Sequence, residues 1–600
     1  MSHHIVEVKE LAHAYPDGTE ALKGVSFRIG HGEAVALVGA NGAGKSTLLM
    51  HLNGYLPTER GEVRIGDTTV TRETVALARR AVGMVFQEFN LIEEPWILAL
   101  SLDGKPVQLS LMALFGQAHR LYGLAGEMDA QDIALLRVLL AILYAVFGRQ
   151  DLQGMAGVPH SEAEACSRWQ ALWDAGQFPM DRMEAYLLGD GVRERFYLFH
   201  PHTPFMQVAL DQEPTIQING QTLSINPLVK PIKALIGDLS ESENKPHLFS
   251  NRTNRETLSC PEAARWLIHL NSYDVSPLGA PPREGFRAKG FKEPWPNKLG
   301  LVWAQGENLF ETLMLNFVLA PSGMDLWEDF LPAWEWEEGF RPEVLAQVET
   351  DFPNDPCELF AFPFRRLQLQ RDDAGQVREC TLWGGHLVAA ENGNPLTETM
   401  TLWKKDKEGR HVPRQHDPAR QMWRDFGALF SATQANPPGI VSWLSRLKRA
   451  GCLNLPMLRL NIGGVVLSGK KTSIDDTVSD SLRFHSALLM DLAEGWPARI
   501  NRELEQTDKG VWRAGKLAGG LVIAGGGSGE KDTKAAEAKA RAEGYFMLDS
   551  PFRQWLESLD DTTDMDVACR AWRDTQAQLF RRFGQEMVQR AGLKALVGRS

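Results

Sequence analysis

The chain has 600 residues, a formal net charge of −12 and 44% hydrophobic residues, a composition that is ordinary for a folded protein. A chain of this length is too long for one compact core, so we expect several domains. The net charge excludes a globally basic nucleic-acid binder, so any contact with phosphates must come from local basic patches.

The cysteines and the N-terminus indicate the cellular compartment in which the protein is located. The six cysteines are scattered without a C-x-x-C pair, which argues against a zinc ribbon and against a disulfide framework. The polar start MSHHIVEVKE predicts no signal peptide. Both features favour a cytoplasmic location, where thiols stay reduced.

The first segment with a chemical signature is EAVALVGANGAGKSTLLMHLNGYL, residues 33–56. It predicts an apolar strand, a glycine-rich turn and a helix, and the alternating IVEVKEL before it predicts another strand. The turn from Gly39 to Ser46 fits G-x-x-x-x-G-K-[ST] completely. Glycines let backbone N–H groups surround a phosphate, Lys45 would reach the outer phosphates, and Ser46 would hold Mg²⁺. ATP and Mg²⁺ are therefore the predicted ligands.

The surrounding residues, from His13 to Asp67, resemble an ABC-transporter ATPase subunit. The resemblance implies that Tyr15 stacks on adenine and that Gln87, which closes VGMVFQ, is the Q-loop residue that touches Mg²⁺. Ser46 and Gln87 would then contact the metal through the nucleotide. The predicted ATP-binding residues are Tyr15, Gly39, Asn41, Gly42, Gly44, Lys45, Ser46, Thr47 and Gln87.

The rest of that ATPase is missing after Gln87. The family needs an LSGGQ-like signature, a Walker B strand ending in Asp-Glu and a switch histidine, and none follows at usable spacing. A distant LSGKK differs at two of five signature positions, and Leu492 stands where the glutamate after Asp491 belongs. Without the carboxylates, Mg²⁺ and the attacking water lose their positioning groups. We predict a truncated ATPase fragment over residues 1–87 and no ATPase activity.

A new pattern begins at residue 88 with EFNLIEEPWILALSLDGKPVQLSLMALFG. It predicts a strand, a turn at DGK, a second strand and then helices. The longest apolar run is IALLRVLLAILYAVFG, residues 133–148, which is shorter than a membrane span and contains Arg137. We therefore predict a buried core helix there and no membrane span.

Residues 88–600 carry an ordered set of segments, namely NLIEEPWI, FYLFHPHTPFMQV and GENLFETLMLNFVL. In this order they resemble CasA, the large subunit of the type I-E CRISPR Cascade complex. The resemblance implies an α+β multidomain fold: a globular α/β region over residues 88–470 and a helical bundle over residues 471–600, preceded by the partial P-loop NTPase fragment. It implies a non-catalytic subunit that binds DNA and crRNA, reads the protospacer-adjacent motif and helps to open the target. Its implied partners are the other Cascade subunits, crRNA, double-stranded target DNA and a helicase-nuclease, with no cofactor.

The most informative charged segment is REGFRAKGFKEPWPNK, residues 283–298, with five basic and two acidic residues. Basic residues neutralise phosphates, glycines allow close approach, and aromatic residues wedge or stack. Composition alone fits a solvated, proline-stiffened loop equally well. The resemblance to CasA favours the loop that reads the motif through the minor groove.

Two more segments match loops of that family. HLFSNRTNRETLSC has the F-x-N pattern of a loop that touches the crRNA end and the DNA, and RLNIGGVVLSGKKTSIDD matches the wedge hairpin that opens the duplex. Beyond the hairpin, residues 476–496 and three later segments predict helices. The predicted nucleic-acid contacts are Phe249, Asn251, Gly285, Lys289, Gly290, Lys292, Ser468, Gly469, Lys470 and Lys471.

These patterns indicate that two genes meet at about Gln87–Glu88. Recombination, deletion or an assembly error that joined two reading frames explains the junction better than a designed two-function protein. The alternatives are an ATP-binding component of an ABC transporter and a fusion that is inactive in both roles.

Overall fold

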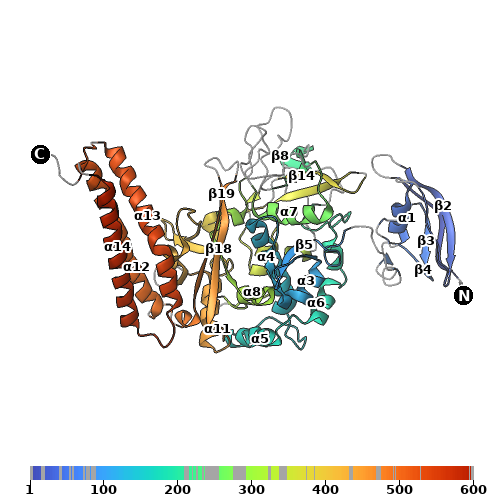
Figure 1. Ribbon diagram of the computed structural model, residues 1–600. Helices are drawn as coiled ribbons and strands as arrows, with labels where there is room; N and C mark the ends of the chain where they lie inside the picture. Colours follow the sequence, from blue (N-terminus) through green and yellow to red (C-terminus); the bar gives the residue numbers. More distant parts are fainter. Residues whose placement is uncertain are drawn as a thin grey trace. The chain divides into compact units, whose positions relative to one another are not determined.

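The structure is a computed structural model that divides into two compact units, Met1–Glu88 and Phe89–Ser600 (Figure 1). The residues that the structure describes are 4–14, 20–39, 43–52, 54, 56, 58, 60–71, 74–75, 82, 89–208, 215–218, 221–224, 228–232, 235–236, 256–274, 292–321, 326–336, 348–349, 351–372, 374–383, 386–430, 437–467, 474–490, 492, 495–527, 529–592 and 595.

The described part of the N-terminal unit contains an antiparallel sheet and the helix α1. The strands pair in the order β2-β1-β3-β4. Val8 and Val63, which are partners across β1 and β3, pack with Leu48 of the helix in a small apolar core. The predicted strand at IVEVKEL and the predicted helix after the glycine turn are confirmed. The elements are β1 (His4–Ala14), β2 (Glu20–Gly30), α1 (Lys45–Leu52), β3 (Arg60–Ile65) and β4 (Thr68–Thr69).

The strand predicted before the glycine turn is wrong. Residues 33–39 form no strand, and the side chains of Val35, Leu37 and Val38 are 56%, 46% and 89% exposed. A continuous apolar run of this kind is typical of a central parallel strand, which needs a neighbouring strand on each side and cover on both faces. Among the described residues no strand pairs with residues 33–39, and three of their apolar side chains are exposed, so the local pattern does not produce the element.

The second unit begins with the predicted strand, turn and strand. β5 (Ile97–Ser101) pairs with β6 (Pro106–Leu109) and β7 (Leu121–Leu124). The DGK turn contains Gly104 at φ +79°, a conformation that glycine adopts without strain. α3 (Leu111–Gln117) follows, and the side chain of Ser110 caps it by accepting a hydrogen bond from the N–H of Ala113.

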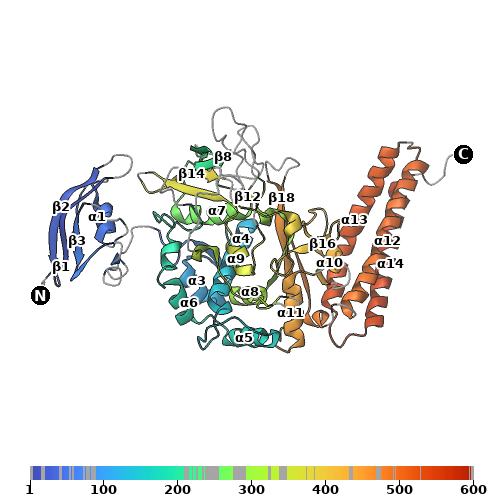
Figure 2. The ribbon, with the colours of Figure 1, turned by 180° about the vertical axis from the view of Figure 1, so that it is seen from behind.

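The longest apolar helix lies in the core, as predicted. α4 (Asp129–Leu143) runs into a π-helical turn, η2 (Tyr144–Gly148). The stretch Asp129–Gly148 is long and apolar enough to cross a membrane, but 94% of its most apolar window is buried inside the unit. Figures 1 and 2 show α4 surrounded by other elements. Burial against protein accounts for its apolar character.

The elements around the predicted DNA-binding segments include a three-stranded antiparallel sheet in the order β11-β18-β19. Strands β18 and β19 form a long hairpin whose connection, residues 468–473, lies outside the described residues. These elements are α7 (Cys260–Ser272), η5 (Trp295–Lys298), β11 (Leu301–Gln305), α8 (Leu309–Asn316), β16 (Leu402–Lys405), β17 (His411–Arg414), β18 (Met457–Leu467) and β19 (Ile474–His485).

The helix predicted to begin at residue 476 is wrong, because this segment is the strand β19. Val478, Leu482 and Phe484 are buried while most residues between them face outward, and the strand pairs with β18 along nearly its whole length. The four-residue spacing of Val478 and Leu482 suits one face of a helix as well as one face of a strand, so pairing with β18 decided the outcome.

A C-terminal helical region is present as predicted, but α12 (Trp496–Ala524) was not among the segments predicted to be helical, and two predicted segments form the single helix α13 (Glu530–Glu557). Figures 1 and 2 show α12, α13 and α14 (Met565–Arg590) side by side. An ion pair of 2.9 Å between Arg553 Nη2 and Asp480 Oδ2 joins α13 to β19. The helical region therefore begins at Trp496, while the hairpin before it belongs to the sheet.

The remaining elements complete the second unit. They are η1 (Ala118–Arg120), α5 (Glu162–Ala175), α6 (Met180–Leu187), η3 (Arg193–Phe196), β8 (Thr215–Ile218), β9 (Gln221–Ser224), β10 (Leu228–Pro231), η6 (Ala333–Glu335), β12 (Val348–Glu349), α9 (Pro356–Ala361), β13 (Arg366–Arg371), β14 (Val377–Trp383), β15 (His386–Leu387), η7 (Ala390–Asn392), η8 (Met422–Asp425), α10 (Phe426–Phe430), α11 (Gly439–Arg449) and η9 (Ser486–Leu489).

Candidate nucleic-acid interface

Of the ten predicted nucleic-acid contacts, the structure describes Lys292. The other nine lie outside the described residues, so their roles stay predictions. They are Phe249, Asn251, Gly285, Lys289, Gly290, Ser468, Gly469, Lys470 and Lys471.

Lys292 lies at the rim of a large open cleft. The cleft has a volume of about 810 Å³ and is lined by four segments of the chain. These are the end of the charged segment, residues 387–391, residues 404–415 from β16, β17 and their flanks, and the last residues of β18. Its lining residues are Lys292, Glu293, Asn297, Lys298, Leu387, Ala389, Ala390, Glu391, Lys404, Pro413, Arg414, Gln415, Val466 and Leu467.

The cleft lining is basic although the chain as a whole is acidic. Four lining residues are Lys or Arg and two are Glu. Lys298 Nζ donates to the carbonyl of Val388 at 2.6 Å, and Arg414 Nη2 pairs with Asp425 Oδ1 at 2.5 Å, so both side chains are held in place. Sequence reasoning missed Lys404 and Arg414. Their signal is the alternation of β-forming and basic residues in TLWKKDKEGRHVPR, which predicts a hairpin but not its position beside the wedge.

A buried ion pair in the second unit contacts the charged segment. Arg137 of α4 donates two hydrogen bonds to Glu398, at 3.0 and 2.9 Å, and both side chains are buried. Trp295 of η5 donates its indole N–H to the same carboxylate at 3.0 Å. Three hydrogen bonds to one carboxylate compensate its loss of water and tie the charged segment to the core helix.

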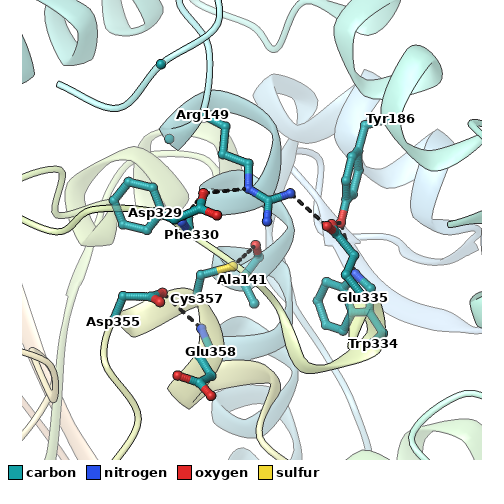
Figure 3. Close-up of polar contacts among 12 residues, drawn as sticks. Ala141, Arg149, Tyr186, Asp329, Phe330, Trp334, Glu335, Asp355, Cys357 and Glu358 are labelled. Carbon is teal, nitrogen blue, oxygen red and sulfur yellow. Dashed lines mark hydrogen bonds and ion pairs between the residues drawn. The ribbon is translucent and has the colours of Figure 1, made fainter. Parts of the chain in front are cut away.

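A second polar network in this unit invites a catalytic interpretation (Figure 3). Arg149, at the end of η2, pairs with Glu335 at 2.8 Å and with Asp329 at 3.2 Å. Tyr186 donates to Glu335 at 2.5 Å and accepts from the indole N–H of Trp334 at 3.0 Å. In these contacts Arg149, Tyr186 and Glu335 bond to one another. The network therefore has a structural explanation, because it links η6 to η2 and α6.

The thiol beside this network is inert. Cys357 Sγ donates to the carbonyl of Ala141 at 3.3 Å, and burial raises the pKa of the Cys357 thiol well above its usual range (Figure 3). The nucleophilic form of cysteine is the thiolate, which this environment disfavours. Among the described residues no cluster of three His, Cys, Asp or Glu side chains is arranged to hold a metal ion.

The glycine turn of the N-terminal unit is described in part. Gly44 has φ +82°, and a Cβ there would collide with the carbonyl oxygen of Ala21, so only glycine fits. Lys45 Nζ reaches back across the turn to the carbonyl of Gly39 at 2.7 Å. These features suit a phosphate turn at the start of a helix. Thr47 is buried in α1, and Ser46 lies in α1 with its side chain outside the described residues. Tyr15, Asn41, Gly42 and Gln87 also lie outside them.

The fold and the cleft define a mixed α+β protein with a C-terminal helical bundle, preceded by part of an ABC-type ATPase. The chain belongs to the family of CRISPR-associated protein Cse1, whose family model matches residues 90–583. The ABC transporter family model matches residues 22–132. Residues 90–132 thus match both models, and in the structure they fold within the second unit. The resemblance to CasA and the predicted fold class are confirmed.

Known proteins match the two units separately. The crystal structure of Thermobifida fusca Cse1 is 30% identical, with a TM-score of 0.70, over 85% of this chain and 94% of that one. The CasA/Cse1 protein of Thermus thermophilus is 29% identical over 351 residues, 57% of this chain and 60% of that protein. An ABC transporter ATP-binding protein of Geobacter sulfurreducens is 73% identical over 88 residues, which are 15% of this chain and 35% of that protein. The chain therefore spans about a third of this ATP-binding relative.

Proposed function

We propose that residues 89–600 form the large, non-catalytic subunit of a type I-E CRISPR Cascade complex and bind target DNA and crRNA. In this role the unit reads the protospacer-adjacent motif, helps to open the duplex and docks the helicase-nuclease. Its partners are the other Cascade subunits, and its location is the cytoplasm. The proposed division is an ATPase fragment, a globular region that includes the hairpin β18–β19, and the helices from Trp496.

The observation that carries this proposal is the cleft. It joins Lys292, from the segment proposed to read the motif, to Val466 and Leu467, at the base of the hairpin proposed to open the duplex. If the charged segment reads the motif and the hairpin opens the adjacent base pairs, both must contact the same stretch of DNA. A basic lining in a chain of net charge −12 suits a phosphate backbone.

The test is DNA binding by the assembled complex at several salt concentrations. Lys289→Ala and Lys292→Ala should weaken binding and reduce the salt slope by about one unit for each phosphate that the variant no longer neutralises. Gly290→Leu should reduce motif discrimination more than non-specific affinity, because it blocks approach to base edges without removing charge.

The control is Lys105→Ala, which removes an exposed lysine outside the cleft lining, on the turn between β5 and β6. It should leave affinity, salt slope and discrimination unchanged. If all the variants have the same affinity, salt slope and motif discrimination as the control, the charged segment is a solvated loop that does not bind DNA, and the proposal is overturned.

We also infer that the N-terminal unit binds ATP weakly without useful turnover. The turn around Gly44 and the position of Lys45 favour phosphate binding. Ser46 and Gln87 would contact Mg²⁺ through the nucleotide. The groups that place the attacking water have no counterpart in the sequence, so hydrolysis is not expected.

A further inference from the structure

The guanidinium of Arg365 bonds to both ends of residues 274–292, which contain most of the charged residues of the segment 283–298. The described chain stops at Asp274, two residues after the end of α7, and resumes at Lys292. Arg365 Nε pairs with Asp274 Oδ2 at 2.5 Å, and Arg365 Nη2 donates to the backbone carbonyl of Lys292 at 2.9 Å. Arg365 is 1% exposed and Asp274 is 4% exposed.

Further bonds fix Arg365 itself. Its backbone N–H donates to Asn271 Oδ1, on the last turn of α7, at 3.1 Å. It directly precedes β13, which pairs with β14 in a three-stranded sheet. On the other side, Asn297 of η5 donates to the carbonyl of Asp274 at 2.5 Å. The sheet, the helix and the re-entering chain thus meet at a single buried group.

Stability alone does not explain a buried arginine here. Desolvating an ion pair offsets much of its attraction, and well-packed apolar residues often stabilise a core equally well. What a guanidinium supplies is a rigid planar fork that donates in two fixed directions at once. At Arg365 one direction ends on Asp274 and the other on Lys292. Arg365 therefore fixes the positions of Asp274 and Lys292, the two ends of the segment 274–292, relative to each other.

The place of re-entry matters because it is also the start of the cleft lining. Lys292, Glu293, Asn297 and Lys298 follow one another into the cleft. A displacement at the carbonyl of Lys292 would carry these side chains with it. Specific contacts to a ligand require the contacting side chains to be held within a fraction of an ångström. A shift of Lys292 would therefore reduce motif discrimination, while the net charge of the cleft would stay the same.

We propose that Arg365 is a positioning residue for motif recognition, because it fixes the two ends of the segment 274–292 relative to the cleft. This inference rests on the proposed function of the second unit. Arg365 does not touch the nucleic acid and acts through Asp274 and Lys292.

The first test is hydrogen exchange in the full chain carrying Arg365→Met or Arg365→Lys. Removal of a hydrogen bond to a charged group lowers local protection by about tenfold or more, so amides of residues 268–274 and 292–298 should exchange faster in Arg365→Met. Lysine carries the charge but not the fork, so Arg365→Lys should restore protection at one end only.

The matched control is Arg446→Met. Arg446 is a buried arginine whose guanidinium donates to the carbonyls of Ala320 and Pro321 at 2.7 and 2.8 Å. Its removal should cost comparable stability without faster exchange at residues 268–274 and 292–298. Equal exchange at these residues in the Arg365 and Arg446 variants would show that Arg365 does not hold the two ends, and would overturn the proposal.

The second readout is DNA binding by the assembled complex, with and without the motif. Arg365→Met should lower motif discrimination by about tenfold while non-specific affinity stays within about twofold, because no phosphate-binding group is removed. Faster exchange with unchanged discrimination would reduce Arg365 to a structural residue and contradict the positioning role. If the wild-type complex shows no motif discrimination, the proposed function fails, and the exchange result still decides whether Arg365 holds both ends.

Discussion

The two units differ in how much of their relatives' length they cover, and the unit with the higher identity covers the smaller share. The N-terminal unit is 73% identical to an ATP-binding protein but covers 35% of it, while the second is 30% identical to a solved Cse1 and covers 94% of it. In the first, three apolar side chains of residues 33–39 are exposed. In the second, the most apolar helix is buried. An apolar segment becomes an element only when the rest of its fold is present.

The largest expected effect comes from breaking the second unit at its buried ion pair. Arg137→Ala would leave the Glu398 carboxylate, which is 0% exposed, without its charged partner. Removing one member of such a pair costs about 3–5 kcal/mol of unfolding free energy. Urea denaturation followed by tryptophan fluorescence measures the decrease.

The exposed pair between Lys105 and Asp103 supplies the control. Lys105→Ala should change the unfolding free energy by less than about 1 kcal/mol, because exposed pairs are screened by solvent. If Arg137→Ala behaves like this control, the buried pair does not hold the core of the second unit.

The second unit should gain stability in mild acid through Asp132. Burial raises the pKa of Asp132 from 3.8 to about 7. The folded state therefore binds a proton that the unfolded state lacks between pH 7 and pH 4, so stability rises as pH falls through this window. The difference is at most about 4 kcal/mol. Asp132→Asn should make the urea midpoint of the second unit less dependent on pH between pH 8 and pH 5. Asp355, whose pKa burial raises to about 7, contributes part of the remaining dependence. An unchanged dependence in Asp132→Asn would contradict the assignment.

The N-terminal unit should respond to acid in the opposite direction through His51. Burial lowers the pKa of His51 from 6.5 to about 4, with His13 as a further cause. The unfolded state then binds more protons between pH 6.5 and pH 4, so this unit loses stability as pH falls. Hydrogen exchange of α1 at pH 7.5 and pH 5 measures the effect. In His51→Phe the contrast should shrink, and acid protection of α1 in the wild type would be inconsistent with a buried neutral histidine.

A smaller effect is expected at the glycine turn. Lys45→Ala should weaken ATP binding by about tenfold, because it removes the cation that meets the outer phosphates. Calorimetry with ATP and Mg²⁺ measures the affinity. Steady-state hydrolysis should stay at background for both proteins; hydrolysis that disappears with Lys45→Ala would show that the fragment is a working ATPase.

Local patterns predicted the elements that turn chemistry and apolar runs define. The hairpin around Gly104 and the helix from Asp129 are examples. Residues 33–39 were predicted wrongly as a strand, because a buried strand depends on neighbours that the local pattern does not contain. The strand Ile474–His485 was predicted wrongly as a helix from residue 476, although its partner β18 directly precedes it, because the four-residue spacing of Val478 and Leu482 also suits a helix. Sequence alone cannot show which strand a segment pairs with.

The sequence predicted which segments contribute to the candidate site, but not how the fold brings them together. The charged segment and the hairpin were identified, and Lys292 lies at the cleft. Arg365 was missed, because its partners Asp274 and Lys292 are 91 and 73 residues away in the chain. A single arginine before a strand resembles an ordinary surface charge until the fold brings these residues together.

The central claim is that two unrelated pieces are joined and that the second is sufficient by itself. The most direct test compares the full chain with a chain that begins at Phe89, each mixed with the other subunits and crRNA of a type I-E complex. The shorter chain should show the same urea midpoint for the second unit, enter the complex equally well and bind motif-containing DNA within about twofold, because the second unit is compact and has its own apolar core. Unfolding of the shorter chain, or its failure to assemble where the full chain succeeds, would show that residues 1–88 are an integral part of the fold and would contradict the account.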